Sequence, residues 1–161
     1  MIQRVYEQCK KSKQLSDVVV ATDDKRIYNH IKSFCGKVVM TNKYHLTGTE
    51  RCNEAAQSMN IDADIIINIQ GDEPFINPNQ INELVDLFEN ENIEIGTLAK
   101  KINSNKLLNN PNNPKAIFDK NRNAINFCRK IESPKKNTIY YKHIGISGFS
   151  FFQFGDKRSK I

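Results

Sequence analysis

Apolar residues in the first half of the chain follow two alternating spacings. Residues 2–13 carry them at the i, i+3, i+4 spacing of an amphipathic helix, and residues 18–21 form a β-branched run typical of a strand. The same alternation predicts three further helices and two further strands, at residues 27–34, 49–59 and 78–88 and at residues 38–40 and 65–69. Alternating strands and helices indicate an α/β fold with a doubly wound parallel sheet.

The pattern changes after about residue 94. Residues 95–98 and 116–118 are typical of strands, and an Asn- and Pro-rich loop, LNNPNNP, lies between them. Strand-like runs continue at residues 125–128 and 139–149. The second part of the chain is therefore expected to be rich in strands.

Length and composition are those of a globular protein with one core. The chain has 161 residues, of which 39% are hydrophobic, and its apolar runs are too short to span a membrane. The first residues, MIQRVYEQCKKSK, lack the apolar segment of a signal peptide, so a cytoplasmic location is expected. The four cysteines form no CxxC pair, and they are expected to be reduced thiols.

Charge is unevenly distributed along the chain. Residues 1–99 carry 10 basic and 15 acidic side chains, whereas residues 100–161 carry 14 basic and 3 acidic ones. The basic part could attract nucleic acid, a sugar acid or a polyphosphate, or it could reflect the Asn, Lys and Ile bias of the composition. Its lysines are not interleaved with aromatic residues along a stripe, so we expect no nucleic-acid partner.

The predicted strand at residues 65–69 ends in the sequence QGDEP. Ligands of parallel α/β sheets bind just beyond the carboxyl ends of strands, and Asp72 follows such an end. Mg²⁺ prefers one or two carboxylates together with phosphate oxygens, so Asp72 is a candidate ligand for a metal that arrives with a nucleoside triphosphate. The alternative is a plain turn, since Gly, Asp and Pro are all favoured in turns.

Three further segments accompany QGDEP: ATDD at residues 21–24, TGTER at 47–51 and KHIGISGF at 142–149. In their order and spacing the four segments resemble the 3-deoxy-manno-octulosonate cytidylyltransferase family, the CMP-Kdo synthetases, over nearly the whole chain. The resemblance implies a Rossmann-like nucleotidyltransferase fold, a three-layer sandwich of the glycosyltransferase-A type. It also implies Mg²⁺ as cofactor, CTP and Kdo as substrates, and a homodimer.

The resemblance also implies roles for particular residues. Asp72 matches a metal-binding aspartate, and Gln70 matches a glutamine that helps to hold the sugar acid. Thr49, Glu50 and Arg51 match the family's segment that lies near the cytosine and ribose. Two further residues match positions that contact the sugar. Arg129 matches an arginine that pairs with the sugar carboxylate, and His143 matches a histidine that contacts the sugar.

Each role has a structural alternative. Arg51 could be a solvated charge on a helix, and His143 could be a satisfied histidine at a strand end. Arg129 lies among several basic residues. Two further predictions concern residues outside the matched roles: Asp23 and Asp24 cap the following helix, and His30 and His45 lie on the surface.

The chain departs from the family pattern at both ends. The family begins with a strand and a basic phosphate-binding loop of the form PARxxSxRxPGKPL, and it continues into a GxDTPEDL segment that carries a second metal ligand; neither is present. Ser147, Phe149 and Ser150 replace residues expected after the IG of the last motif. We therefore expect one partial nucleotidyltransferase domain over residues 1–161, with impaired activity.

The expected function is the transfer of CMP from CTP to Kdo, with release of pyrophosphate, for lipopolysaccharide biosynthesis. Two alternatives stay open. The chain could serve another acidic sugar, such as a sialic acid or amino-substituted Kdo, or it could be a non-catalytic remnant that binds a nucleotide or a protein partner.

Overall fold

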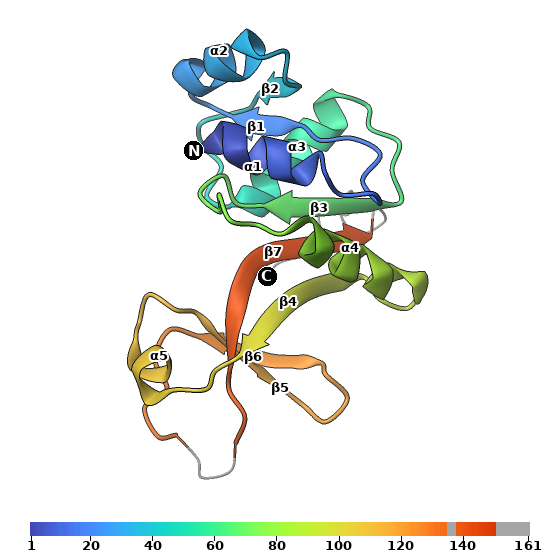
Figure 1. The fold of residues 1–161 in the computed structure, drawn as a ribbon. Helices are drawn as coiled ribbons and strands as arrows, with labels where there is room; N and C mark the ends of the chain where they lie inside the picture. Colours follow the sequence, from blue (N-terminus) through green and yellow to red (C-terminus); the bar gives the residue numbers. More distant parts are fainter. Residues whose placement is uncertain (135–137, 151–161) are drawn as a thin grey trace. The chain divides into compact units, whose positions relative to one another are not determined.

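The computed structural model describes residues 1–134 and 138–150 (Figure 1). Contacts within the chain divide it into two compact units. The first comprises Met1–Gly96 together with residues 146–150, and the second comprises Thr97–Gly145. The single partial domain expected over residues 1–161 stays a prediction.

The first unit alternates helices and strands as the hydrophobic spacing predicts. In chain order its elements are α1 (Ile2–Cys9), β1 (Val20–Thr22), α2 (Lys25–Ser33), β2 (Val38–Met40), α3 (Gly48–Ser58), β3 (Ile65–Ile69), α4 (Pro78–Asp86) and the 3-10 helix η1 (Leu87–Glu89). The prediction for the first helix is wrong in its length, because α1 ends at Cys9 rather than at residue 13. Among the described residues, no helix is long and apolar enough to cross a membrane.

Side-chain caps fix where the helices begin. Asp24 caps α2, as predicted, and its carboxylate accepts a hydrogen bond from the backbone N–H of Arg26 at 2.7 Å. At α3 the cap is Thr47, which forms a reciprocal capping box with Glu50. Pro78 is the first residue of α4, where its missing N–H costs no hydrogen bond.

The pairing of the strands is mixed rather than wholly parallel. β1 and β2 pair in parallel, with Val20 opposite Val38. β3 pairs antiparallel with residues 146–150 of β7 (Tyr141–Ser150), with Ile67 opposite Gly148. The prediction of a parallel sheet is therefore wrong for the pairing of β3. The order of the elements along the chain does not reveal that a strand some 80 residues later pairs with β3.

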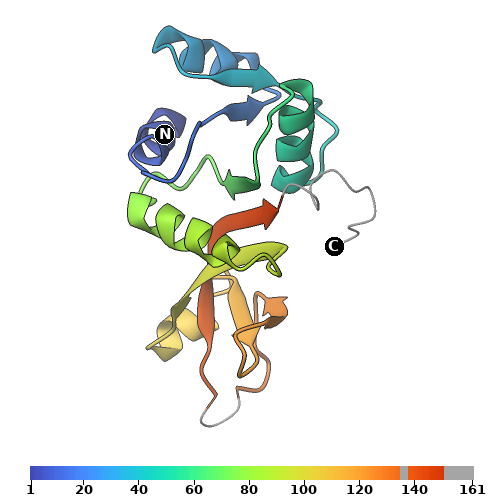
Figure 2. The same cartoon turned by 90° about the vertical axis from the view of Figure 1, so that its right-hand side faces the viewer.

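Helices α1 and α3 lie on opposite sides of β1 and β3, α1 in dark blue and α3 in teal in Figure 2. Val5 and Cys9 of α1 and Ile81 and Leu84 of α4 are buried, as their helical spacing predicts. The other buried apolar residues of this unit are Ile31, Ala55, Ala56, Ile76, Ile146 and Phe149. Both faces of the strands are thus covered, which explains the continuous apolar run of β3.

The second unit is rich in strands, as expected, and β5 pairs antiparallel with both β6 and β7. Its elements are β4 (Ile95–Lys101), α5 (Asn105–Asn109), β5 (Lys115–Phe118), β6 (Ala124–Cys128) and the first half of β7. β5 and β6 form a hairpin whose turn is held by Asp119, since its carboxylate accepts hydrogen bonds from the backbone N–H groups of Asn121 and Asn123 at 2.8 Å each. Helix α5 lies partly in the expected Asn- and Pro-rich loop and is capped by Ser104.

The cysteines are free thiols, as predicted. Burial raises the pKa of Cys9 and of Cys52 to about 11, so both stay protonated at neutral pH. They act as small apolar residues of the first unit.

Close packing at Gly148 gives a stability prediction. A Cβ atom there would lie 2.6 Å from Cε2 of Phe88 and 2.9 Å from Cδ1 of Ile67. Gly148→Ala should lower the free energy of unfolding by about 1–3 kcal/mol, as overpacking does, measured by urea denaturation. In a double-mutant cycle, Phe88→Leu should relieve part of this loss, and strict additivity of the two changes would contradict the packing argument.

Candidate functional site

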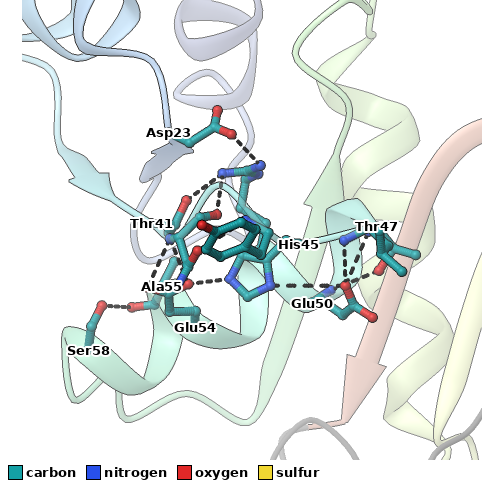
Figure 3. Close-up of polar contacts among 12 residues, drawn as sticks. Asp23, Thr41, His45, Thr47, Glu50, Glu54, Ala55 and Ser58 are labelled. Atoms are coloured by element: carbon teal, nitrogen blue, oxygen red, sulfur yellow. Dashed lines mark hydrogen bonds and ion pairs between the residues drawn. The ribbon is translucent and has the colours of Figure 1, made fainter.

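Arg51 joins the carboxyl ends of β1 and β2. Its Nη1 donates to Oγ1 of Thr41 at 2.7 Å and its Nη2 to the carboxylate of Asp23 at 3.0 Å. Thr41 directly follows β2 and Asp23 directly follows β1 (Figure 3). The side chain of Arg51 is only 20% exposed, so the alternative of a solvated charge is wrong. Its planar fork suits this bridging task.

His45 lies against the same helix and is largely buried, so the prediction of a surface position is wrong. Its ring contacts the carboxylate of Glu54, and its Nδ1 lies 4.0 Å from Oε2 of Glu50 (Figure 3). Glu54 also accepts hydrogen bonds from the backbone N–H of Asn42 at 2.9 and 3.1 Å. The hydrogen bond from the Asn42 N–H, followed by that of His45, lowers the pKa of Glu54.

Gln70 lies beside the first turn of α3. A Cβ atom at Gly48 would lie 3.0 Å from Nε2 of Gln70 and 3.4 Å from Nδ2 of Asn68. Glycine therefore permits the end of β3 to approach the start of α3. The structure thus brings Gln70 together with the TGTER segment, in which Thr49 is half-buried in the first turn of the helix.

Glu50 serves the fold of this corner. Its Oε2 accepts hydrogen bonds from the N–H groups of Leu46 at 2.8 Å and Thr47 at 3.3 Å. The side chain thereby closes the loop that precedes α3 and helps to hold His45. Glu50 thus has a structural role in this loop, and its contact with a nucleotide stays a prediction.

Asp72 lies at the tip of a turn that follows β3. The N–H of Glu73 donates to the carbonyl of Gln70 at 3.2 Å, so a β-turn forms at residues 70–73. Asp72 and Glu73 are both exposed. The turn and the candidate metal ligand are therefore compatible, because the turn presents the carboxylate beyond the end of the strand.

Asp72 alone is a partial metal site. Within residues 1–134 and 138–150 there is no group of three or more His, Cys, Asp or Glu side chains placed to hold a metal ion. Mg²⁺, however, is often bound through one or two carboxylates and the oxygens of a substrate phosphate. The exposed carboxylate of Asp72 fits a metal that arrives with its triphosphate, and it does not fit a resident metal bound by the protein alone.

The second unit carries Arg129, which directly follows β6. Its side chain is exposed, and Nη1 makes one long hydrogen bond, 3.5 Å, to the carbonyl of Pro111. Its backbone carbonyl accepts a hydrogen bond from Nζ of Lys115 at 2.8 Å, and the same ammonium donates to the carbonyl of Asn110 at 2.6 Å. Lys115 is completely buried and holds the backbone from which Arg129 projects.

His143 is half-buried in the second unit. Its Nε2 lies 2.8 Å from Oγ1 of Thr97, and its ring meets that of Phe127 edge to face, with the centroids 5.3 Å apart. Desolvation lowers the pKa of His143 below its ordinary value of 6.5. The ring is therefore neutral at pH 7, and its contacts agree with the alternative of a satisfied histidine.

Sequence reasoning missed several residues of these networks. Asp23 was predicted to cap α2, which is wrong, because it pairs with Arg51 instead. Thr41 could have been found, since it directly follows a predicted strand. The other missed residues, His45, Glu54 and Lys115, have no local signature. His30 is exposed, as predicted.

The chain is similar to known proteins over most of its length. The cytidylyltransferase family model matches residues 1–157. The chain is 44% identical, over 93% of its length, to a 3-deoxy-manno-octulosonate cytidylyltransferase of Thermodesulfovibrio yellowstonii. It is 43% identical, over 93% of its length, to an 8-amino-3,8-dideoxy-manno-octulosonate cytidylyltransferase of Shewanella pealeana.

A solved structure is similar as well. A CMP:2-keto-3-deoxy-manno-octonic acid synthetase complexed with CTP superimposes with a TM-score of 0.83 and 33% identity, over 92% of this chain and 62% of that one. The chain spans 65% and 64% of the length of the two relatives above. The Rossmann-like nucleotidyltransferase fold predicted from the motifs is thus confirmed.

The burial of His143 gives a prediction about pH. Because its folded pKa is lowered, the unfolded chain takes up a proton first as the pH falls below 6.5, and stability is lost down to the folded pKa. NMR titration should show His143 titrating below the same histidine in a short unfolded peptide. His143→Gln should lose less stability between pH 7.5 and 5.5 than the parent chain. A titration at or above 6.5 would contradict the effect of burial.

Proposed function

The chain belongs to the cytidylyltransferase family, and we propose that it binds CTP and transfers CMP to the sugar acid Kdo, with release of pyrophosphate. The observation that carries the proposal is the polar corner at the amino end of α3. There Arg51 holds the ends of β1 and β2, and Gln70 approaches Gly48 from the end of β3. Nucleotides bind in such crevices, beyond the carboxyl ends of strands.

The proposed reaction is the attack of the anomeric hydroxyl of Kdo on the α-phosphate of CTP. Catalysis of this kind rests on positioning and on stabilisation of developing negative charge. Asp72 would hold Mg²⁺ that is bound to the triphosphate, and the metal would neutralise charge on the phosphates. Thr49, Glu50 and Arg51 would lie near the cytosine and ribose, with Arg51 kept in place by Asp23 and Thr41.

Recognition of the sugar acid is proposed for Gln70, Arg129 and His143. Arg129 has an exposed guanidinium with one weak contact, so it can form a bidentate pair with the sugar carboxylate. His143, neutral at pH 7, would offer a hydrogen bond without a charge. We further propose a cytoplasmic location and a homodimer, in keeping with the motifs that the chain shares with the family.

A second candidate substrate is 8-amino-3,8-dideoxy-manno-octulosonate. It is favoured by the similar identity, 43% against 44%, to a relative named for that sugar. Release of pyrophosphate from CTP and Mg²⁺ would be measured with Kdo, the amino sugar and a sialic acid in parallel. Release with Kdo above the other two supports the proposal, and faster release with another sugar reassigns the substrate.

Binding measurements on the same purified protein test the non-catalytic alternative. Isothermal titration calorimetry with CTP, and with ATP and UTP as controls, would measure binding without turnover. Selective binding of CTP with no pyrophosphate release from any sugar would favour a nucleotide-binding protein. Absence of both binding and release would overturn the proposed function.

The two neighbouring carboxylates of the turn provide a matched pair of variants. Asp72→Asn should lower the rate of pyrophosphate release by about 10²- to 10³-fold, since it removes one strong electrostatic contact. Glu73→Gln changes a neighbour that is also exposed, and it should retain the rate within a few-fold. Equal losses in the two variants would contradict the assignment of Asp72 to the metal. Circular dichroism would confirm that both variants fold.

Arg129 and its neighbour Lys130 form a second matched pair, since both are exposed. Arg129→Lys should raise the KM for Kdo by roughly 10-fold or more, because the single ammonium cannot reproduce the two parallel hydrogen bonds of the guanidinium. The affinity for CTP should stay unchanged in calorimetry. Lys130→Gln should change neither quantity. A loss of CTP affinity in Arg129→Lys would refute the assignment to the sugar carboxylate.

A further inference from the structure

The buried ammonium group of Lys115 joins two separate segments of the second unit. Lys115 is completely buried, and its Nζ donates to the backbone carbonyls of Asn110 at 2.6 Å and of Arg129 at 2.8 Å. Asn110 directly follows α5, and Arg129 directly follows β6. The ammonium therefore links the loop before β5 to the backbone of the arginine that is proposed for the sugar carboxylate.

The charge of this ammonium is not balanced by a carboxylate. None of the ion pairs within residues 1–134 and 138–150 includes Lys115, and both acceptors of its Nζ are carbonyls. A charge without an opposite charge is costly to bury, and an apolar side chain of similar length would fill the space without that cost. What the ammonium adds over such a side chain is a fixed link between its two acceptors.

The Asn- and Pro-rich loop at residues 108–114 contacts both residues of the second unit that are proposed for the sugar. The carbonyl of Pro111 accepts a hydrogen bond from Nη1 of Arg129 at 3.5 Å. The carbonyl of Pro114 accepts one from the backbone N–H of His143 at 2.9 Å. This loop, which has no role in the proposed reaction so far, thus connects the two sugar-binding candidates.

The loop is short and stiff. Proline fixes φ at Pro111 and Pro114, and the N–H of Asn113 donates to the carbonyl of Asn110 at 3.1 Å, which closes a turn. The same carbonyl is one of the two acceptors of Lys115. The position of the loop is therefore tied, through one ammonium, to that of the residue after β6.

The charges of the second unit favour an anion. Residues 97–145 carry 11 Lys and Arg side chains but two acidic ones, Asp119 and Glu132. The carboxylate of Asp119 holds the β5–β6 turn, and Glu132 is exposed. Salt screens a buried charge less than an exposed one, so Lys115 maintains a positive potential beside the backbone of Arg129. A sugar carboxylate would supply the opposite charge.

We propose that Lys115 is a positioning residue for the sugar acid. Its ammonium fixes the backbone of Arg129 against the loop, so that the guanidinium meets the sugar carboxylate in one orientation. A bidentate pair depends on that orientation, and a side chain that is held in advance loses less freedom on binding. The inference rests on the proposed function, in which Arg129 pairs with the carboxylate. Lys115 itself does not touch the sugar, because it is completely buried.

Lys115→Met tests the proposal, because it removes the ammonium and keeps a long side chain. The Kd of Kdo from calorimetry and the KM for Kdo should each rise by roughly 5- to 20-fold, whereas kcat and the Kd of CTP should change by less than about three-fold. Lys120→Met, the same change at an exposed residue of the β5–β6 turn, should leave all four quantities unchanged. Equal losses of affinity for Kdo and CTP in Lys115→Met would show a merely structural role and overturn the proposal.

A double variant tests whether Lys115 acts through Arg129. Arg129→Lys already removes the bidentate pair, so the further change Lys115→Met should weaken Kdo binding by less than about two-fold more. If the two single losses multiply in full, the ammonium acts by another route and the proposal fails.

A measurement on the parent chain needs no variant. Without substrate, ¹⁵N relaxation should give the backbone amide of Arg129 an order parameter of about 0.85, the value of rigid backbone, although its side chain is exposed. A value below about 0.6 would show that the ammonium does not hold this segment, and it would overturn the proposal even if Lys115→Met does not fold.

Calorimetry with Kdo separates this inference from the proposed function. Weaker binding of Kdo by Lys115→Met than by the parent chain supports the inference even if no pyrophosphate is released and the proposed transfer fails. Release of pyrophosphate by the parent chain, with unchanged affinity for Kdo in Lys115→Met, overturns the inference alone. A parent chain that binds no Kdo overturns both.

Discussion

The start of helix α3 is the point on which the rest of the first unit depends. Thr47 and Glu50 close its capping box, and Arg51, one residue later, reaches the ends of β1 and β2. Gly48 lets the end of β3 approach the same turn. One turn of helix thereby fixes the relative positions of three strand ends.

The residues proposed to act on the substrates are of two kinds, those held in place by the protein and those exposed to a ligand. The polar corner of the first unit, where we propose that the nucleotide binds, is organised in advance, since Arg51 and His45 are largely buried and each contacts a carboxylate. Asp72 and Arg129 are exposed and have few protein partners. A ligand would therefore supply what these two side chains lack, a metal with its triphosphate at Asp72 and a carboxylate at Arg129. Side chains held in place by the protein, together with exposed side chains that are available to a ligand, suit a reaction between two substrates.

Sequence reasoning succeeded where the determining contacts are local. The helices follow from apolar spacing, and Asp24 marks the start of α2. It failed where the partner is remote: β3 pairs with a strand some 80 residues later. The sequence wrongly predicts a surface position for His45, because Glu54 becomes its partner only once the preceding loop folds back on α3. Lys115 has no signature at all, since its acceptors are backbone carbonyls.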